Sequence, residues 1–126
     1  MAPQTYEKGR QIRTTLLGAD YVQRAAASAD EFSQALQDLV TEYCWGAVWG
    51  RDGLPLKTRS MLNLAMIAVL NRPHELATHI RGALSNGVTR DEIREIFLQV
   101  GVYAGIPAAV DSFRVAKAAF AELEAE

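Results

Sequence analysis

The sequence predicts one all-α domain of about six helices over residues 1–126. Strand signals are almost absent, because no stretch alternates apolar and polar residues and β-branched residues do not cluster. Apolar residues instead recur at helical spacing, and capping pairs, glycines and prolines mark where helices end and begin. The connections are short and the chain contains no internal repeat or linker, which favours a single domain.

The length and composition are typical of a globular protein that needs no disulfide. Of 126 residues, 49% are hydrophobic and 22% charged, and 13 basic against 15 acidic residues leave a net charge of −2. This balance argues against general nucleic-acid binding, which requires a basic face. Cys44 is the single cysteine, and no charged segment followed by an apolar stretch opens the sequence. We therefore expect a cytoplasmic protein.

The first part of the chain predicts three helices. One covers residues 6–17 and ends at Gly18, and a shorter Ala-rich helix follows over 21–27. Ser28 and Glu31 have the spacing of a capping box that starts the third helix. The apolar residues beyond it recur at helical spacing, so their shared face is expected to pack inward. They are Phe32, Leu36, Leu39, Val40 and Tyr43.

Residues 44–53 predict a helix end that runs into a structured loop. This segment holds three glycines and two tryptophans, which disfavour a long regular helix. Trp45 and Trp49 are four residues apart and would share a face if the helix continued. They can wall an apolar pocket, or fill the core and a subunit interface. Cys44 is expected to be a small buried apolar group rather than a nucleophile.

The next segment predicts two helices. One over residues 56–70 follows Pro55 and is apolar on nearly every side, so it is expected to be central. Its apolar run is about half of the ~20 residues that a membrane span needs. The other covers 74–85 and ends at Asn86 and Gly87, a natural left-handed cap.

Two further helices complete the chain. Thr89 and Glu92 have the spacing of a second capping box, which opens a helix that ends at Gly105. Pro107 starts the last helix, which is amphipathic and runs into an acidic tail.

Several kinds of site are excluded. The sequence contains no CxxC, no HExxH and no glycine-rich phosphate loop. Two histidines and one cysteine are too few for the common zinc sites, so no metal site is expected.

His79 is the first candidate site residue. Glu75 lies one turn before it, and the small residues Gly82 and Ala83 lie one turn after it, which leaves space above the imidazole. This spacing fits a pocket face. From spacing alone, however, a half-buried histidine that is hydrogen-bonded to a backbone carbonyl or to Glu75 fits better.

Arg59 is the second candidate, because it opens an otherwise apolar helix. A guanidinium so close to the core needs an anionic partner, which is either Glu42 or a substrate carboxylate. A purely structural ion pair with Glu42 is the alternative. Arg51, Arg72 and Arg81 are further cations near these turns, where solvated surface charges are common.

Four ordered blocks of sequence carry a family resemblance. They are EYCWGAVWGRDGL at 42–54, KTRS at 57–60, HIRGALSNGVTRDEIRE at 79–95 and YAGIPAA at 103–109. Together they resemble the γ-carboxymuconolactone decarboxylase family over residues 6–121. The resemblance implies the all-α, alkylhydroperoxidase D-like fold and assembly as a homo-oligomer, a trimer or a hexamer.

The same superfamily has a redox branch with a CxxC followed four residues later by a histidine. Counted back from His79, this chain has Arg72 and Glu75 at the two cysteine positions. Neither residue can form a thiolate, so a peroxidase of that type is excluded.

The resemblance implies cofactor-independent decarboxylation of γ-carboxymuconolactone to 3-oxoadipate enol-lactone, a step of protocatechuate breakdown in the β-ketoadipate pathway. The departing carboxylate of this substrate is conjugated through the ring alkene to the lactone carbonyl. The substrate therefore supplies its own electron sink, and no cofactor is expected. The protein must hold the carboxylates, stabilise the oxyanion and return one proton to carbon.

The implied roles fall on the residues already singled out. Arg59 would anchor a substrate carboxylate or the lactone oxygen, and Trp45 and Trp49 would form an apolar wall for the leaving carboxylate. His79, with an ordinary pKa near ~6.5, would donate the proton or a hydrogen bond to the oxyanion. Glu42 would orient Arg59 or His79, or act as the acid itself.

Arg51 and Arg81 complete the expected substrate-binding residues. The expected partners are a small lactone carboxylate and further copies of the chain, with neither nucleic acid nor membrane. Two alternatives remain open at this point. One is a paralogue that acts on a different lactone or activated acid, and the other is a non-catalytic helical oligomer that binds a small acid.

Overall fold

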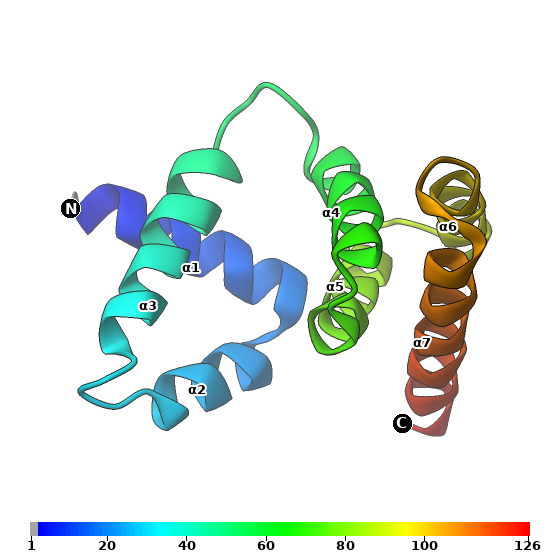
Figure 1. The fold of residues 1–126 in the computed structure, drawn as a ribbon. Helices are drawn as coiled ribbons and strands as arrows, with labels where there is room; N and C mark the ends of the chain where they lie inside the picture. Colours follow the sequence, from blue (N-terminus) through cyan, green and yellow to red (C-terminus); the bar gives the residue numbers. More distant parts are fainter. Residues whose placement is uncertain (1–2) are drawn as a thin grey trace. The chain divides into compact units, whose positions relative to one another are not determined.

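A computed structural model describes residues 3–126, in which every regular element is a helix (Figure 1). The predicted all-α fold class is confirmed. The chain forms two compact units, unit 1 over Met1–Pro55 and unit 2 over Leu56–Glu126. The single domain over 1–126 stays a prediction, and its first two residues lie outside the described residues. No helix in the described part of the chain is long and apolar enough to cross a membrane.

Unit 1 contains α1 (Pro3–Leu17), α2 (Ala19–Ser28), α3 (Gln34–Leu39) and η1 (Val40–Val48). The first helix ends at Gly18, as predicted, because the residue adopts a φ of 93° that glycine alone adopts readily. The fourth element, η1, is a π-helix that continues directly from α3.

The packing of α1 against η1 depends on two glycines. A Cβ on Gly9 would lie 1.9 Å from the carbonyl oxygen of Thr41, and one on Gly46 would lie 2.3 Å from that of Thr5. Real Cβ atoms do not approach an oxygen so closely, so the two helices meet backbone to backbone at this crossing.

The predicted capping box at Ser28 and Glu31 is wrong. The Ser28 hydroxyl donates to the carbonyl of Ala25, and α3 begins only after a turn closed by Asp30 and Ser33. The Ser33 amide donates to the Asp30 carboxylate at 2.9 Å, and the Asp30 amide donates to the Ser33 hydroxyl at 3.0 Å. The hydrogen bonds from Ser33 lower the pKa of Asp30. A short polar side chain that bonds the local backbone thus sets this boundary.

The apolar face predicted to pack inward is also largely exposed. Phe32 is 95% exposed, and Leu36, Leu39 and Tyr43 are each more than half exposed. The buried face of η1 instead consists of Thr41, Glu42, Trp45, Gly46 and Trp49. The cause is the close contact with α1, which only the side of η1 that carries Gly46 can make.

The predicted helix end near residue 44 is wrong as well. The amide of Trp49 donates to the carbonyl of Cys44 at 2.9 Å, five residues back, so a π-helical turn carries the chain through Gly46 to Val48. Cys44 lies on the outer side of η1 and is exposed, which corrects the expectation that it is buried.

Unit 2 contains α4 (Leu56–Leu70), α5 (Pro73–Ser85), α6 (Arg90–Ala104) and α7 (Ile106–Ala125). These bounds agree closely with the prediction. Within the unit, α4 lies beside α5 and α6 beside α7 (Figure 1). The residues at the centre of its core are almost completely buried: they are Leu64, Ile80, Ile93 and Phe97.

The helix caps of unit 2 form as predicted. Gly87 has a φ of 93°, and beside it the Val88 amide donates to the carbonyl of Ala83 at 2.9 Å. The Glu92 amide donates to the Thr89 hydroxyl at 3.0 Å, and the Thr89 amide donates to the Glu92 carboxylate at 2.9 Å. The hydrogen bond from the Thr89 backbone, followed by the one from Lys57, lowers the pKa of Glu92.

The expectation that α4 is central is confirmed within unit 2, because α4 contacts α5, α6 and α7, but only one side of it is buried. Ser60, Leu64 and Ala68 face the core, whereas Met66 and Leu70 are more than half exposed. Beside them an open groove, here called the α4–α6 groove, runs between the two helices. Its apolar lining includes Met61, Leu62, Ala65, Val69, Ile96 and Tyr103.

Candidate functional site

Three of the predicted site residues lie on the buried face of η1 in unit 1. Glu42 is 8% exposed, Trp45 4% and Trp49 7%. The two indole rings stack with centroids 4.6 Å apart and planes inclined by 26°. The conditional expectation that the tryptophans share a face is therefore confirmed, and they form one continuous apolar surface.

The contact of η1 with α1 accounts for the burial of these side chains. Gly46 lets the backbone of α1 approach this side of η1, and Glu42, Trp45 and Trp49 are buried along with it. Segments with hydrogen bonds to the fifth residue back often occur at functional sites. Unit 1 thus provides a buried carboxyl group and two stacked indoles.

The other central candidates lie in unit 2, on the adjacent helices α4 and α5. Arg59 is half-buried and its Nε atom is fully buried. Asn63 follows one turn later on the same side of α4, and its Nδ2 atom lies 3.5 Å from Nδ1 of half-buried His79 on α5. Unit 2 thus places a guanidinium and an imidazole on neighbouring turns of two packed helices.

A second polar contact joins the same two helices. The Asn86 side chain, just after α5, donates to the Ser60 hydroxyl at 3.0 Å, and Ser60 is only 2% exposed. Because α4 and α5 also bury Leu64 and Ile80 in the core, their relative register is fixed along several turns.

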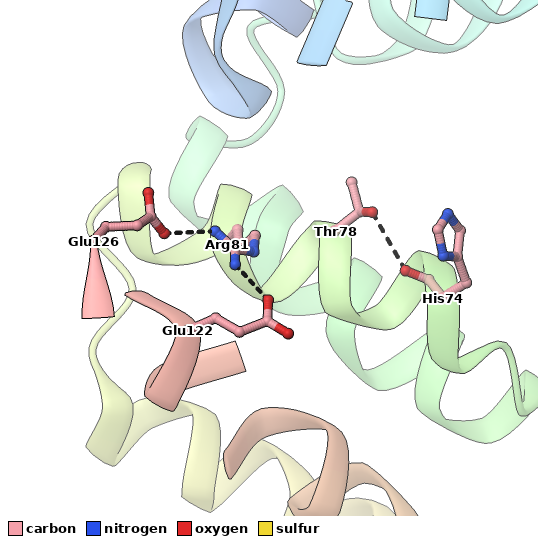
Figure 2. A network of polar contacts seen from close by, with 5 residues as sticks. All are labelled: His74, Thr78, Arg81, Glu122 and Glu126. Atoms are coloured by element: carbon pink, nitrogen blue, oxygen red, sulfur yellow. Dashed lines mark hydrogen bonds and ion pairs between the residues drawn. The ribbon is translucent and has the colours of Figure 1, made fainter. Parts of the chain in front are cut away.

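Arg81 lies on α5, two residues beyond His79, and its charge is directed at the end of α7 (Figure 2). Its Nη2 atom lies 2.6 Å from a Glu122 carboxylate oxygen, and Nη1 lies 3.1 Å from one of Glu126. Both hydrogen bonds raise the pKa of Arg81 above its ordinary value, and the one with Glu122 contributes most. The helix therefore presents Arg81 on a different side from His79.

The remaining predicted residues are exposed. Arg51 lies in the connection that follows η1, within unit 1. His74 lies in the first turn of α5, where its carbonyl accepts a hydrogen bond from the Thr78 hydroxyl at 3.3 Å (Figure 2). His74 is therefore a surface residue near the start of α5.

Asn63 is the polar residue that sequence reasoning did not single out. An available signal was its position, because it is an amide within the apolar run of α4. A half-buried amide requires hydrogen-bond partners, and His79 Nδ1 is one that the structure provides. Among the described residues, no group of three or more histidines, cysteines and carboxylates has the arrangement of a metal site.

Comparisons with known proteins agree with the sequence blocks. Residues 34–118 match the model of the Carboxymuconolactone decarboxylase family. The chain is 38% identical over 120 residues to the 4-carboxymuconolactone decarboxylase of Acinetobacter baylyi, which covers 95% of this chain and 90% of the relative. It is 42% identical over 110 residues to the nitrosuccinic acid decarboxylase of Metarhizium robertsii, covering 87% and 77% of the two chains. An uncharacterized 15.0 kDa protein of Paracoccus denitrificans is 34% identical over 88 residues, covering 68% of this chain and 65% of that protein.

Proposed function

The chain belongs to the carboxymuconolactone decarboxylase family, and we propose that it converts γ-carboxymuconolactone to 3-oxoadipate enol-lactone without a cofactor. The observation that carries this proposal is the 38% identity to a 4-carboxymuconolactone decarboxylase along nearly the full length of both chains. In the reaction, the bond between the ring carbon and the carboxylate breaks, and its electron pair moves through the alkene onto the lactone carbonyl oxygen. A proton then adds to carbon.

Arg59 and His79 are the residues proposed to act on the charges of this reaction. Arg59 binds a substrate carboxylate or the developing oxyanion through charge-assisted hydrogen bonds. His79 donates a hydrogen bond to the oxyanion or returns the proton. Their placement on neighbouring turns of α4 and α5 supports a joint role.

Trp45, Trp49 and Glu42 have proposed roles that follow from their burial in unit 1. The stacked indoles provide a surface against which a carboxylate loses water, which favours its departure as uncharged carbon dioxide. Glu42 either orients a basic side chain of the site or serves as the acid that protonates carbon.

Arg51 and Arg81 are proposed to attract and hold the second carboxylate of the substrate. Exposure of Arg51 to solvent supports a role in attraction rather than in the chemical step. Arg81 is already paired with Glu122 and Glu126, so a substrate carboxylate would have to compete with two carboxylates of the chain.

The protein is further proposed to be a cytoplasmic homo-oligomer, a trimer or a hexamer, that acts in protocatechuate breakdown. The apolar α4–α6 groove supports assembly, because a soluble protein rarely leaves such a surface in water. Leu62 and Met66 on α4 are each about half exposed, at 47% and 54%. Light scattering at micromolar concentration tests the assembly: a single species of three or six chains is expected, and a monomer would contradict it.

A second candidate substrate follows from the relative of Metarhizium robertsii. Nitrosuccinate also carries an electron sink, since its nitro group is bound to the same carbon as one carboxylate. The 42% identity to a nitrosuccinic acid decarboxylase therefore favours the same chemistry on a different activated acid. Both candidates need a cation for the developing oxyanion and a proton for carbon.

A direct comparison of the two substrates tests the proposal. γ-Carboxymuconolactone is generated from 3-carboxymuconate by a cycloisomerase, and nitrosuccinate is added separately, with carbon dioxide release followed in both. We expect kcat/KM to be at least about a hundredfold higher for the lactone, a difference of roughly 2.7 kcal/mol in transition-state binding. A preference for nitrosuccinate would select the second candidate, and no release from either acid by the folded protein would favour a binding role.

A further inference from the structure

The contact between Asn63 and His79 bears on the protonation state of the imidazole. The nitrogen of the Asn63 amide, Nδ2, faces Nδ1 of His79 at 3.5 Å. An amide nitrogen only donates hydrogen bonds, so with the Asn63 amide in this orientation Nδ1 is the acceptor. A neutral imidazole that accepts at Nδ1 carries its proton on Nε2.

We propose that Asn63 is a positioning residue that holds His79 as the neutral tautomer with its proton on Nε2. The inference deepens the proposed function, on which its catalytic consequence rests. Neither α4 nor α5 can easily shift to break the contact, because Leu64 and Ile80, each next in sequence to one of the pair, are fully buried in the core. The hydrogen bond from Asn86 to Ser60 joins the end of α5 to α4 about one turn before Asn63.

The tautomer decides between the two roles that the proposed function leaves open for His79. An imidazolium would carry a proton on Nδ1 as well, which would face the Asn63 amide nitrogen donor to donor. A neutral imidazole, in turn, is a poor proton source, since its loss of the Nε2 proton leaves an imidazolate. His79 therefore donates a hydrogen bond from Nε2 to the oxyanion, and the proton on carbon comes from solvent through an acid other than His79.

Nitrogen-15 NMR of the full-length protein, labelled at histidine and without substrate, tests the tautomer directly. The spectrum is recorded in the pH range where the imidazole nitrogen shifts no longer change with pH, so that both imidazoles are neutral. Only two histidines contribute, and exposed His74 on the same helix serves as the internal reference. We expect a protonated Nε2 and a bare Nδ1 for His79. A proton on Nδ1 in the wild type would overturn the proposal.

Two substitutions of Asn63 sharpen the test. In Asn63→Asp the new carboxylate only accepts, so the His79 proton is expected to move to Nδ1. Asn63→Leu removes the donor and is expected to leave a mixture of the two tautomers. Asn71→Asp, the same chemical change at an exposed residue just after α4, is the control and should leave the His79 signals unchanged. An Asn63→Asp protein that folds and retains the Nε2 proton would contradict the proposal, and the wild-type spectrum tests it even if this variant does not fold.

Activity on γ-carboxymuconolactone tests the consequence for the reaction. Asn63→Asp is expected to lower kcat by about tenfold or more with a smaller change in KM. Substrate binding is retained, but the N–H group of His79 then lies at Nδ1 and no longer at Nε2, which faces the oxyanion. His79→Gln, which keeps an N–H donor, is expected to retain at least about ten times the kcat of His79→Leu. Equal losses in the two His79 variants would contradict the hydrogen-bond role. A wild-type protein without activity would instead refute the proposed function, while the NMR result on the tautomer would stand.

Discussion

The indole rings of Trp45 and Trp49 stack on one another at the end of η1, with their centroids 4.6 Å apart. Trp45 lies within η1 and Trp49 is the residue that follows its last turn, and both side chains are buried. In the proposed reaction these two rings form the apolar surface that faces the leaving carboxylate. The contribution of this pair to the fold can be measured separately from its contribution to activity.

Replacing either tryptophan is expected to destabilise the protein. Trp45→Ala and Trp49→Ala should each lower the free energy of unfolding by about 3–5 kcal/mol, since each removes a large buried side chain. In the double variant, the loss of unfolding free energy should be about 0.5–1.5 kcal/mol smaller than the sum of the two single losses. The reason is that each single substitution already removes the stacking between the rings. Urea denaturation of the four proteins measures this coupling. Tyr43→Ala, an exposed aromatic on the same helix, is the control and should change stability by no more than about 0.5 kcal/mol.

The close crossing of α1 and η1 predicts that a single methyl group added at this crossing strongly lowers the stability of the protein. Gly9→Ala should destabilise the protein by about 1–3 kcal/mol or more, because its Cβ would meet the Thr41 carbonyl oxygen. Gly18→Ala is the matched control, since its Cβ meets nothing within 4 Å and the change tests only the left-handed φ of 93°. That strain is expected to be about 1 kcal/mol. Equal losses in the two variants would show that α1 and η1 are not in close contact.

The capping box of α6 predicts a dependence of stability on pH. The pKa of Glu92 lies below its ordinary value of 4.5, because the Thr89 amide and then Lys57 donate hydrogen bonds to the carboxylate. A carboxyl whose pKa is lower in the folded state contributes stability that is fully present above the unfolded pKa and is lost as the pH falls through the folded pKa.

Glu92→Gln isolates this dependence, because glutamine still accepts a hydrogen bond in the capping box but carries no charge for Lys57. The variant should be less stable than the wild type near pH 7, and the difference should shrink as the pH falls below 4.5 and through the lowered pKa of folded Glu92. Urea unfolding across this range measures it. Glu31→Gln, which removes an exposed carboxylate from unit 1, is the control. A stability difference that persists unchanged at low pH would contradict the assignment.

The proposed roles of Arg59 and His79 predict large losses of activity without loss of the fold. Arg59→Ala and His79→Leu should each lower kcat/KM for γ-carboxymuconolactone by about a hundredfold or more. Two exposed residues on nearby turns provide the controls, Arg72→Ala and His74→Gln. Steady-state kinetics and circular dichroism are measured together on all four variants. Near-normal kinetics in Arg59→Ala or in His79→Leu would remove that residue from the site.

The fold of unit 2 was predictable from sequence because its signals are local. Gly87 can adopt a left-handed φ, and Thr89 and Glu92 satisfy each other's backbone amides within a single turn. The same kind of signal misled at Ser28, where Asp30 and Ser33 bond the backbone instead. Local capping chemistry thus predicts a boundary only when no neighbouring residue competes for it.

The buried face of η1 could not be predicted, because it depends on a contact between distant segments. Periodicity placed Phe32 inward, whereas the approach of Gly9 to Thr41 selects the side that carries Gly46. The candidate site was predictable only in part, for a related reason. His79 and Arg59 stand out by residue type, but the importance of Asn63 follows only from the packing of α4 against α5.

Carbon dioxide release from γ-carboxymuconolactone, formed in place by a cycloisomerase and followed with the dialysed protein in the presence of a chelator, tests the central claim most directly. We predict rapid release, with a kcat of about 1 s⁻¹ or faster, that the chelator does not reduce. The same release should yield 3-oxoadipate enol-lactone in equal amount. No release above the uncatalysed rate from a folded, oligomeric protein would contradict the account.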